Sequence, residues 1–316
     1  RQELQLEEGE PIPRERLTEV EQLMVCGQTL AGSVQEHAEL AEYCHDHYTV
    51  ENAHGDISDH DLKLLSQCTN LRVLVLDYQQ ITDLSPLANL SLEYLSLTGN
   101  QIANLAPLSG MEALRVLDLG ENPVRSVDAL AELPALQEVT LEATGITSVD
   151  VFAESGIQSL NVRSTWITDF SSLASCANLS RLIVGELPGG AVETLAGLIN
   201  LEELRLYATS AVDLSYFVGF QKLRELDLYG SAISHPEALA QLPNLRFVNL
   251  GGTGVCDLSF LTQLPAMTDL DLREDPLTDL TPLLDCPWLT ILILSSQHQP
   301  LVQEQLSHAA FQIQYQ

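Results

Sequence analysis

The chain has few basic residues and many acidic ones. Its 316 residues include 14 Lys and Arg against 44 Asp and Glu, so its formal net charge is -30 at pH 7. Such a charge repels nucleic acid and the anionic faces of membranes. We therefore expect no nucleic-acid partner. Two explanations of the acidic surface stay open, namely a basic partner and the solubility of an extended molecule.

Long apolar runs are also missing. No stretch of eighteen consecutive apolar residues occurs, so we expect no direct membrane insertion of this segment. The chain opens RQELQLEEGEPIP, without Met and without the apolar core of a signal peptide. That start is expected of a piece cut from a longer protein.

Sequence motifs of catalysis are absent as well. We find no nucleophile elbow, no phosphate-binding glycine loop and no HExxH helix. His235 falls on a predicted turn, and the other histidines lie toward the ends of the chain, so no catalytic triad is predicted. We predict no enzymatic activity and no cofactor.

Leucine at regular spacing is what the chain has in abundance. The stretch Leu114 to Leu136 reads L-x-x-L-x-L-x-x-N-x-V, the signature of a leucine-rich repeat. Counting the first leucine as position 0, the leucines at positions 3 and 5 face one core because side chains alternate along a strand. The pattern recurs about every twenty-two residues, with starts at Leu71, Leu92, Leu114, Leu136, Ile157, Leu179, Leu201, Leu223, Leu245, Met267 and Leu289.

The segments that return from one strand to the next predict short turns. Residues 82–90 (TDLSPLANL), 103–111 (ANLAPLSGM) and 278–286 (TDLTPLLDC) each combine a capping-type Asp or Asn with an early Pro. Proline there loses only an N–H that is unpaired at a helix start. We predict an α/β solenoid: a leucine-rich repeat horseshoe with a parallel sheet on its concave side, short 3-10 or irregular turns on its convex side, a helical N-terminal cap and a short C-terminal cap.

Repeats of this length with DLSPLANL-like turns resemble the internalin-type bacterial leucine-rich repeats. The resemblance covers about Leu71 to Ser296. It implies protein recognition without naming the target, in a segment of a larger bacterial surface or sensor protein. It also implies an extracellular or cell-surface location, with a cytoplasmic one as the alternative.

The chain departs from this pattern at position 8. Asparagine occupies that position only at Asn100 and Asn122, and Leu187 occupies it where LPGGAV is expected to bulge. We expect hydroxyls to take over much of the asparagine hydrogen bonding at Thr144, Thr165, Thr209, Ser231 and Thr253.

The ends of the chain look different from its middle. Residues 1–13 are acidic and aperiodic, which predicts a linker or disordered end. We predict an N-terminal cap with degenerate repeats over 14–70, the solenoid over 71–296 and a C-terminal cap over 297–316. In the last of these, PLVQEQLSHAA is expected to be helical, and Ile313 and Tyr315 are expected at core positions.

Histidine and cysteine in the predicted N-terminal cap allow alternative interpretations. His45, His47, His54 and His60 lie among aspartates, but without a standard ligand spacing, which favours a solvated loop over a metal site. No metal ligand is predicted. Cys26 and Cys44 are the one pair suited to a disulfide. Elsewhere, thiols at core positions are expected to be buried, at Cys68, Cys176 and Cys286.

Arginines are expected on the concave face, where positions 2, 4 and 6 of each strand project and where we predict a protein partner. Arg163, Arg181 and Arg205 would suit an anionic ligand. However, Glu142, Glu203 and Asp227 lie beside them in the same columns, on strands about 4.8 Å apart. Mutual neutralisation is therefore the favoured interpretation.

Two tyrosines are at the centre of the candidate binding site. Tyr207 and Tyr229 are neighbours in the position-6 column, between Gly185 and Gly251. Exposed aromatic side chains beside unpaired charge are typical anchors, so we place the partner here. The alternatives are that the tyrosines only pack on each other, and that the solenoid is a spacer or scaffold region of a multidomain protein. Further candidate residues follow on the next strands, where the two acids lack partners in their own columns: Phe247, Asp269, Asp271 and Arg273.

Overall fold

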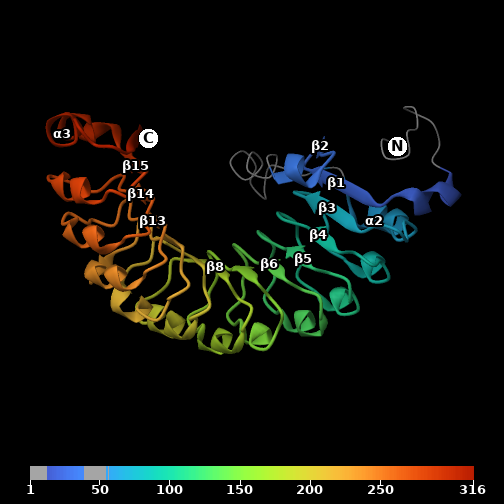
Figure 1. The fold of residues 1–316 in the computed structure, drawn as a ribbon. Coiled ribbons are helices and arrows are strands. Elements are labelled where there is room, and N and C mark those ends of the chain that lie inside the picture. The colour runs from blue at the N-terminus through green and yellow to red at the C-terminus, as the bar shows by residue number, and fades with distance from the viewer. Residues whose placement is uncertain (1–12, 39–54, 56) are drawn as a thin grey trace. The chain divides into compact units, whose positions relative to one another are not determined.

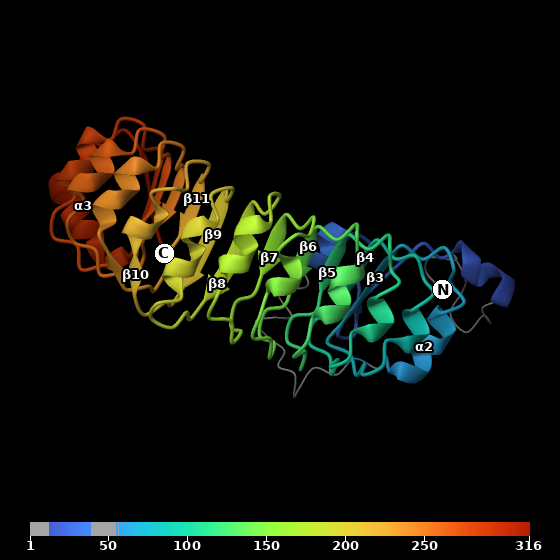
Figure 2. The same cartoon turned by 90° about the horizontal axis from the view of Figure 1, so that it is seen from below.

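The chain forms two compact units of leucine-rich repeats. The computed structural model describes residues 13–38, 55 and 57–316, and contacts divide the chain into Arg1–Trp166 (unit 1) and Ile167–Gln316 (unit 2). Within each unit, parallel strands lie on one face and short helices on the other, with the core leucines between them (Figures 1 and 2). The predicted leucine-rich repeat solenoid is confirmed.

Unit 1 contains one sheet with the strand order β7-β6-β5-β4-β3-β1-β2, in which only the β1–β2 pair is antiparallel. Its strands are β1 (Gln22–Cys26), β2 (Thr29–Leu30), β3 (Val73–Asp77), β4 (Tyr94–Ser96), β5 (Val116–Asp118), β6 (Glu138–Thr140) and β7 (Ser159–Asn161). Its helices are η1 (Arg14–Glu19), α2 (Asp59–Leu65), η2 (Ser85–Leu87), η3 (Ala106–Leu108), η4 (Asp128–Glu132) and η5 (Asp150–Phe152).

Unit 2 contains a parallel sheet with the order β8-β9-β11-β13-β14-β15-β16, and a second, two-stranded sheet. The strands are β8 (Arg181–Gly185), β9 (Glu203–Tyr207), β10 (Val212–Asp213), β11 (Glu225–Asp227), β12 (Ile233–Ser234), β13 (Phe247–Asn249), β14 (Asp269–Asp271), β15 (Ile291–Leu294) and β16 (Gln312–Tyr315). The helices are η6 (Ser171–Ser175), η7 (Val192–Gly197), η8 (Leu214–Phe217), η9 (Pro236–Gln241), η10 (Ser259–Gln263), η11 (Thr281–Asp285), η12 (Ser296–His298) and α3 (Gln299–Gln305).

The repeat leucines form the dry core, as the alternation along each strand predicts. Leu117 and Leu119 of one repeat are fully buried, and so are Leu204 and Leu206 in unit 2. The return segments between repeats are 3-10 helices of three to six residues, so the expected short turns are confirmed. Three thiols at core positions are buried as predicted, those of Cys68, Cys176 and Cys286.

Position 8 hydrogen-bonds neighbouring repeats to one another. The Asn100 carbonyl oxygen accepts from the Ile81 N–H at 3.0 Å, and its amide donates to the carbonyl oxygens of Leu76 and Leu97 at 2.8 Å. Ser231 does the same with one hydroxyl, which accepts from the Thr209 N–H and donates to the Leu206 carbonyl, both at 3.0 Å. The expected replacement of Asn by hydroxyls is therefore confirmed at this position.

Position 7 turns the backbone out of each strand in a left-handed conformation. Its N–H donates to the carbonyl at position 6 of the next repeat, as from Glu121 to Glu142 at 2.8 Å and from Ala208 to Tyr229 at 3.1 Å. Glycine suits this conformation, yet most repeats carry another residue there. The residues other than glycine with positive φ at this position are Tyr78, Glu121, Ala143, Ser164, Glu186, Ala208 and Glu274.

Both ends of the chain extend the repeat register. At the N-terminal end, β1 pairs with β3 so that Val25 lies beside Leu76. At the C-terminal end, the predicted helix is present as α3 but ends at Gln305, and β16 places Ile313 beside Leu292 and Tyr315 beside Leu294. The core position expected of Tyr315 is wrong, because β16 is the last strand of its sheet and leaves this side chain 36% exposed. The segment boundaries at 13/14, 70/71 and 296/297 stay predictions, and residues 1–12 of the proposed linker lie outside the described residues.

Candidate functional site

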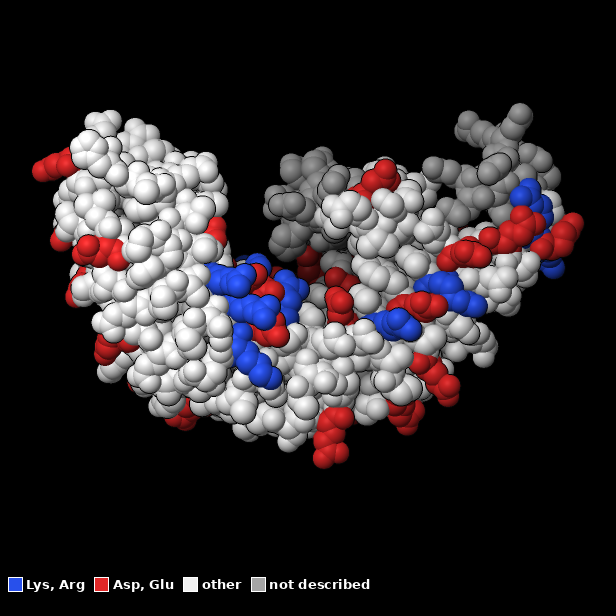
Figure 3. All heavy atoms as spheres, viewed as in Figure 1, with Lys and Arg blue, Asp and Glu red and all other residues white. Residues whose placement is uncertain are grey.

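The candidate site lies on the exposed side of the sheet in unit 2. We call the side of each sheet that carries positions 2, 4 and 6 the sheet face. The strands β8, β9, β11, β13 and β14 bring the predicted site residues of unit 2 together there, in parallel register. Figure 3 shows basic side chains lying next to acidic ones on the visible surface.

Glu203 forms ion pairs with two of the arginines. Its carboxylate accepts from Arg181 Nε at 2.7 Å and from Arg205 Nε at 2.6 Å. In unit 1, Arg163 pairs with Glu142 at 3.6 Å. The predicted ion pairs of Arg163 and Arg181 are therefore present, and the arginines do not form a bare basic patch.

The predicted partner of Arg205 is wrong. Asp227 lies beside Arg205 in the strand register, but the guanidinium turns along its own strand to Glu203 and approaches Glu225 at 3.9 Å. Side chains two residues apart on a strand share one face, so a long arginine reaches either neighbour. The Asp227 carboxylate instead accepts the Tyr229 N–H at 3.0 Å. Burial raises the pKa of Asp227, although hydrogen bonds from Tyr229 and Asn249 oppose the rise.

Both tyrosines are half-buried and held by charged neighbours. The Tyr229 hydroxyl donates to Glu274 at 2.9 Å, and the Arg273 guanidinium carbon lies 5.9 Å from the centre of its ring. Arg205 Nη1 donates to the Tyr207 hydroxyl at 3.5 Å. The hydrogen bond to Glu274 raises the pKa of Tyr229, because it stabilises the protonated phenol.

Gly251 has no side chain and so leaves room on the sheet for the ring of Tyr229. A Cβ atom at Gly251 would lie 3.2 Å from Tyr229 Cδ2 and 3.1 Å from the Arg273 carbonyl oxygen. On the other side of the pair, Gly185 lies beside Tyr207 in the strand register. The ring of Tyr229 therefore occupies space that a side chain at residue 251 would need.

The expected unpaired acids have partners. Asp271 forms an ion pair with Arg273 Nη2 at 2.7 Å and accepts from Arg273 Nε at 2.9 Å. Asp269 accepts the Thr268 hydroxyl at 2.6 Å, and Phe247 lies partly exposed beside it in the register. The prediction looked for partners only in the same column and overlooked the next position along the same strand.

A polar pocket on the sheet face of unit 1 was not predicted. It has a volume of about 210 Å³ and lies where the N-terminal cap meets β3 to β7. Four carboxyl side chains line it, and no Lys or Arg does. The lining residues are His37, Asp77, Tyr78, Thr98, Asp118, Gly120, Glu121, Thr140, Glu142 and Asn161.

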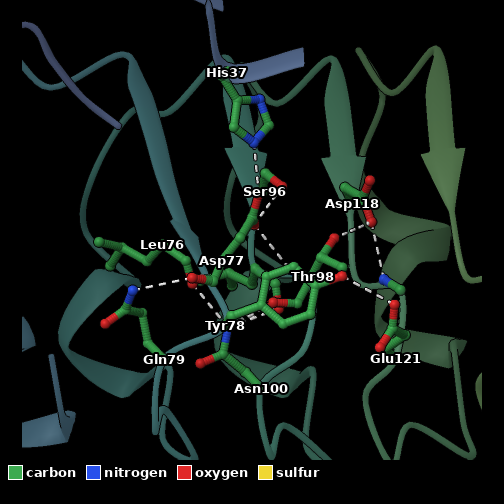
Figure 4. A network of polar contacts seen from close by, with 12 residues as sticks. His37, Leu76, Asp77, Tyr78, Gln79, Ser96, Thr98, Asn100, Asp118 and Glu121 are labelled. Atoms are coloured by element: carbon green, nitrogen blue, oxygen red, sulfur yellow. Dashed lines mark hydrogen bonds and ion pairs between the residues drawn. The ribbon is translucent and has the colours of Figure 1, made fainter. Parts of the chain in front are cut away.

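Asp77 is the centre of the hydrogen bonds in this pocket (Figure 4). One carboxylate oxygen contacts His37 Nε2 at 2.6 Å, and the other accepts from the Ser96 hydroxyl at 2.7 Å and the Thr98 N–H at 2.9 Å. His37 belongs to a helical segment, residues 34–38, of the predicted cap. The contact therefore fastens the cap to the sheet.

Burial and crowded negative charge shift the pKa values in this pocket. Burial, and next the charge of Asp77, raise the pKa of Asp118 to about 6. Burial raises the pKa of Tyr94, on the neighbouring strand, to about 12. Burial alone would lower the pKa of His37, but its hydrogen bond and attraction to Asp77 outweigh burial and raise it. Such a pocket favours a positively charged group over an anion.

Tyr78 and Glu121 are two lining residues of the pocket that bond to each other. The Tyr78 hydroxyl donates to Glu121 at 3.0 Å, and burial raises the pKa of the phenol. A Cβ atom at Gly99 would clash with the Tyr78 ring, so glycine is needed there. The sequence signal for this pocket was the set of acids at positions 4, 6 and 7 in three of four consecutive repeats, those that start at Leu71, Leu114 and Leu136.

The most exposed large apolar side chain among the described residues lies away from both sheet faces. Trp166 is 75% exposed and borders a groove of about 670 Å³ at the turns that follow the strands of unit 1. Arg125, Pro123 and Gly145 also line this groove. Sequence reasoning did not identify it, because a single tryptophan on a turn carries no periodic signal.

The alternative metal cluster and disulfide of the sequence fall in the predicted N-terminal cap. Within residues 13–38, 55 and 57–316, no group of three or more His, Cys, Asp or Glu is placed to hold a metal ion. His45, His47, His54 and Cys44 lie outside the described residues, and with them the proposed metal cluster and disulfide. In the same described ranges, no helix is long and apolar enough to cross a membrane.

Comparison with known proteins identifies the repeats. A family model described as leucine-rich repeats (2 copies) matches residues 90–132. No match was found among curated proteins. The chain therefore has the leucine-rich repeat fold that its strand and turn geometry define.

Solved structures extend this likeness over the chain. An internalin (inlF) of Listeria monocytogenes is 24% identical at a TM-score of 0.71, with 96% of this chain and 88% of that one covered. A leucine-rich repeat protein of Leptospira interrogans is 22% identical at a TM-score of 0.61, covering 80% and 74%. A plant peptide hormone receptor in complex with RGF2 is 16% identical at a TM-score of 0.51, covering 74% and 45%. The resemblance to bacterial internalin-type repeats is thus confirmed for the fold.

Proposed function

We propose that this chain is a non-catalytic recognition module that binds a protein partner on its sheet face. The observation that carries the proposal is the Tyr207–Tyr229 pair, which is half-buried on a rigid sheet and held by Arg205, Glu274 and Arg273. Tyrosines held in place lose little entropy on binding, and they combine apolar area with a polar tip. Centrally placed aromatic and arginine side chains are the usual anchors of protein interfaces.

The ion pairs around the tyrosines suit selective contact with a partner more than long-range attraction of an anion. Arg181, Arg205 and Arg273 each have an acid within 2.7 Å, so the surface has no excess of positive charge to attract an anion from a distance. Paired charges at an interface mainly select among partners by complementarity. We expect the remaining residues of this surface in unit 2, Phe247, Asp227, Asp269 and Asp271, to contribute to this selection. Arg163, on the sheet face of unit 1, stays a separate prediction of a binding residue.

The cellular location of the chain is part of the same proposal. We propose that it is part of a larger bacterial surface or sensor protein, in an extracellular or cell-surface location. Support comes from the fold, which the chain shares with an internalin of L. monocytogenes.

A photo-crosslinking experiment identifies the partner and the surface together. Replacing Phe247 with p-benzoylphenylalanine puts the reactive group on the sheet face of unit 2, and replacing Leu284, which is 48% exposed on the turn side, provides the control. We expect a cross-linked protein from the first position and none from the second. Cross-links from position 284 alone would contradict the proposal.

The affinity of the captured partner is then measured with variants. Tyr207→Ala together with Tyr229→Ala should weaken binding at least tenfold, because central aromatic anchors contribute about 2 kcal/mol or more each. Trp166→Ala is the matched control, since it removes an exposed aromatic side chain away from the sheet face. If Trp166→Ala weakens binding more than the double variant does, the partner uses the groove and not the sheet face.

A further inference from the structure

Asp275 occupies the asparagine position of a repeat in unit 2. The repeat starts at Met267, so Asp275 is at position 8, the position of Asn100 and Asn122. Its side chain is completely buried, at 0% exposure. A buried carboxyl group needs a partner for each oxygen or must give up its charge.

The carboxyl group bonds to the preceding repeat, as asparagine does, with one oxygen only. Its Oδ1 accepts the N–H of Gly254, at position 9 of the preceding repeat, at 2.7 Å, whereas the Asn122 oxygen accepts the N–H of Ile102, at position 10 of the preceding repeat, at 2.9 Å. Its Oδ2 is buried without a hydrogen-bond partner among the described residues. In Asn122, the second atom is an amide nitrogen that donates to the carbonyls of Leu97 and Leu119 at 2.8 and 3.1 Å.

An ionised carboxylate cannot perform the role of that amide. An asparagine amide is a donor, whereas a carboxylate is an acceptor only and would be repelled by backbone carbonyl oxygens. A protonated carboxylic acid carries one O–H donor, which restores the missing function.

We propose that Asp275 is a proton-operated latch: with a proton on Oδ2 it joins the neighbouring repeats as asparagine does, and loss of that proton opens the turn at residues 274–276.

The surroundings of Asp275 favour the neutral form. Burial raises its pKa to about 7, while hydrogen bonds from Gly254, Val255 and Thr253 work in the opposite direction. The titratable groups of the flanking turns are Cys256 and Asp257 before it and His298 after it, and none of them hydrogen-bonds to Asp275.

The adjoining charged side chains are engaged on the sheet face. Arg273 is paired with Asp271, and Glu274 accepts the Tyr229 hydroxyl. Burial raises the pKa of Asp275, and the hydrogen bonds from the backbone and from Thr253 oppose that rise.

The latch is connected to the proposed binding surface by one residue. Glu274 precedes Asp275, holds the Tyr229 hydroxyl at 2.9 Å, and donates its N–H to Ser295 Oγ at 2.9 Å. Opening of the turn would release this support of Tyr229. This consequence for binding rests on the proposed function, whereas the opening itself does not.

The sign of the pH effect follows from proton linkage. The folded state binds the Asp275 proton more tightly than the unfolded state, in which the pKa of Asp is about 3.9. The turn is therefore most stable at low pH, and its opening constant rises about tenfold per pH unit between about pH 4 and pH 7, then levels off.

The test compares the unmodified chain with two variants in which Asp and Asn are exchanged at position 8 of a repeat. Thermal unfolding and amide hydrogen exchange, corrected for the intrinsic effect of pH, are measured from about pH 5 to pH 9. We expect Asp275→Asn to remove the pH dependence of exchange at the Gly254 amide. Asn122→Asp should create a similar dependence at the Ile102 amide in unit 1. An unchanged pH profile in Asp275→Asn would overturn the latch.

A direct titration covers the case in which a variant does not fold. The carboxyl carbon of Asp275 is followed by NMR in the unmodified chain. A midpoint near pH 7 supports the proposal, and a midpoint near the ordinary value of about 4 contradicts it. Neither result depends on whether a partner binds the sheet face, so failure of the latch and failure of the proposed function are distinguishable.

Discussion

At the scale of single residues, the leucine positions were predictable and the polar contacts were only partly so. Leu117 and Leu119 are buried because a strand has only two faces. Arg205 was assigned to Asp227 across strands, but it bonds to Glu203 on its own strand at 2.6 Å. The repeat positions predict which backbone positions lie beside each other, on strands about 4.8 Å apart. An arginine side chain is long enough to reach acids on its own strand as well as on the neighbouring ones.

The left-handed residues at position 7 lead to a prediction about stability. Ala143 has φ of 52°, where a Cβ atom costs about 1 kcal/mol that glycine avoids. Ala143→Gly should raise the free energy of unfolding by about 1 kcal/mol, measured by urea denaturation.

The matched control for this prediction is Ala131→Gly. Ala131 is exposed in η4 and has no positive φ, so glycine there should lower stability by about 0.5–1 kcal/mol. The account of position 7 fails if both variants change stability in the same direction.

At the scale of the elements, the repeats were predictable, and the contacts of the N-terminal segment with the sheet were not. The same leucine and proline spacing recurs in successive repeats, so strands such as β5 and turns such as η3 could be placed from it. The strand β1 keeps the repeat register, since Val25 lies beside Leu76. The contact of His37 with Asp77 joins residues forty positions apart, and only the folded chain brings them together.

The contact between cap and sheet leads to a prediction about pH. Because the pKa of His37 is raised in the folded state, its contribution is complete below the unfolded pKa of about 6.5 and is lost as pH rises through the folded value. His37→Ala should lower the free energy of unfolding by about 1–3 kcal/mol near pH 6, since it leaves a buried carboxylate oxygen of Asp77 without this partner. The loss should be smaller near pH 8, as measured by urea denaturation at both values.

Asp118 needs a separate control, because its pKa is raised to about 6 in the same unit. For that carboxyl group the stability falls between about pH 4 and pH 6, below the window of His37. Asp118→Asn should therefore flatten the profile at acidic pH and leave the change between pH 6.5 and 8 in place. If His37→Ala is equally destabilising at pH 6 and pH 8, the histidine is not charged in the folded state.

At the scale of the whole molecule, the fold class was predictable and the partner was not. The spacing of leucines specifies a scaffold, whereas the partner is specified by a few side chains on the sheet face that vary freely without affecting the core. The pocket around Asp77 and the groove beside Trp166 illustrate this, since neither disturbs the leucine pattern.

The net charge of -30 leads to a prediction about salt. Repulsion among acidic side chains destabilises the folded chain and is screened as ionic strength rises. Raising NaCl from about 10 mM to about 300 mM should raise the midpoint of thermal unfolding by a few degrees. A lower midpoint in salt would mean that ion pairs such as Arg181 with Glu203 outweigh the repulsion.

The central claim is that the partner contacts the sheet face, opposite the leucine core. Hydroxyl-radical footprinting of the chain with and without its captured partner tests this claim most directly, because tyrosine, phenylalanine and tryptophan are all reactive. We predict protection of Tyr207, Tyr229 and Phe247, with no change at Tyr216, which is 39% exposed on η8, or at Trp166. Protection of Tyr216 or Trp166 without protection of the sheet-face residues would contradict the account.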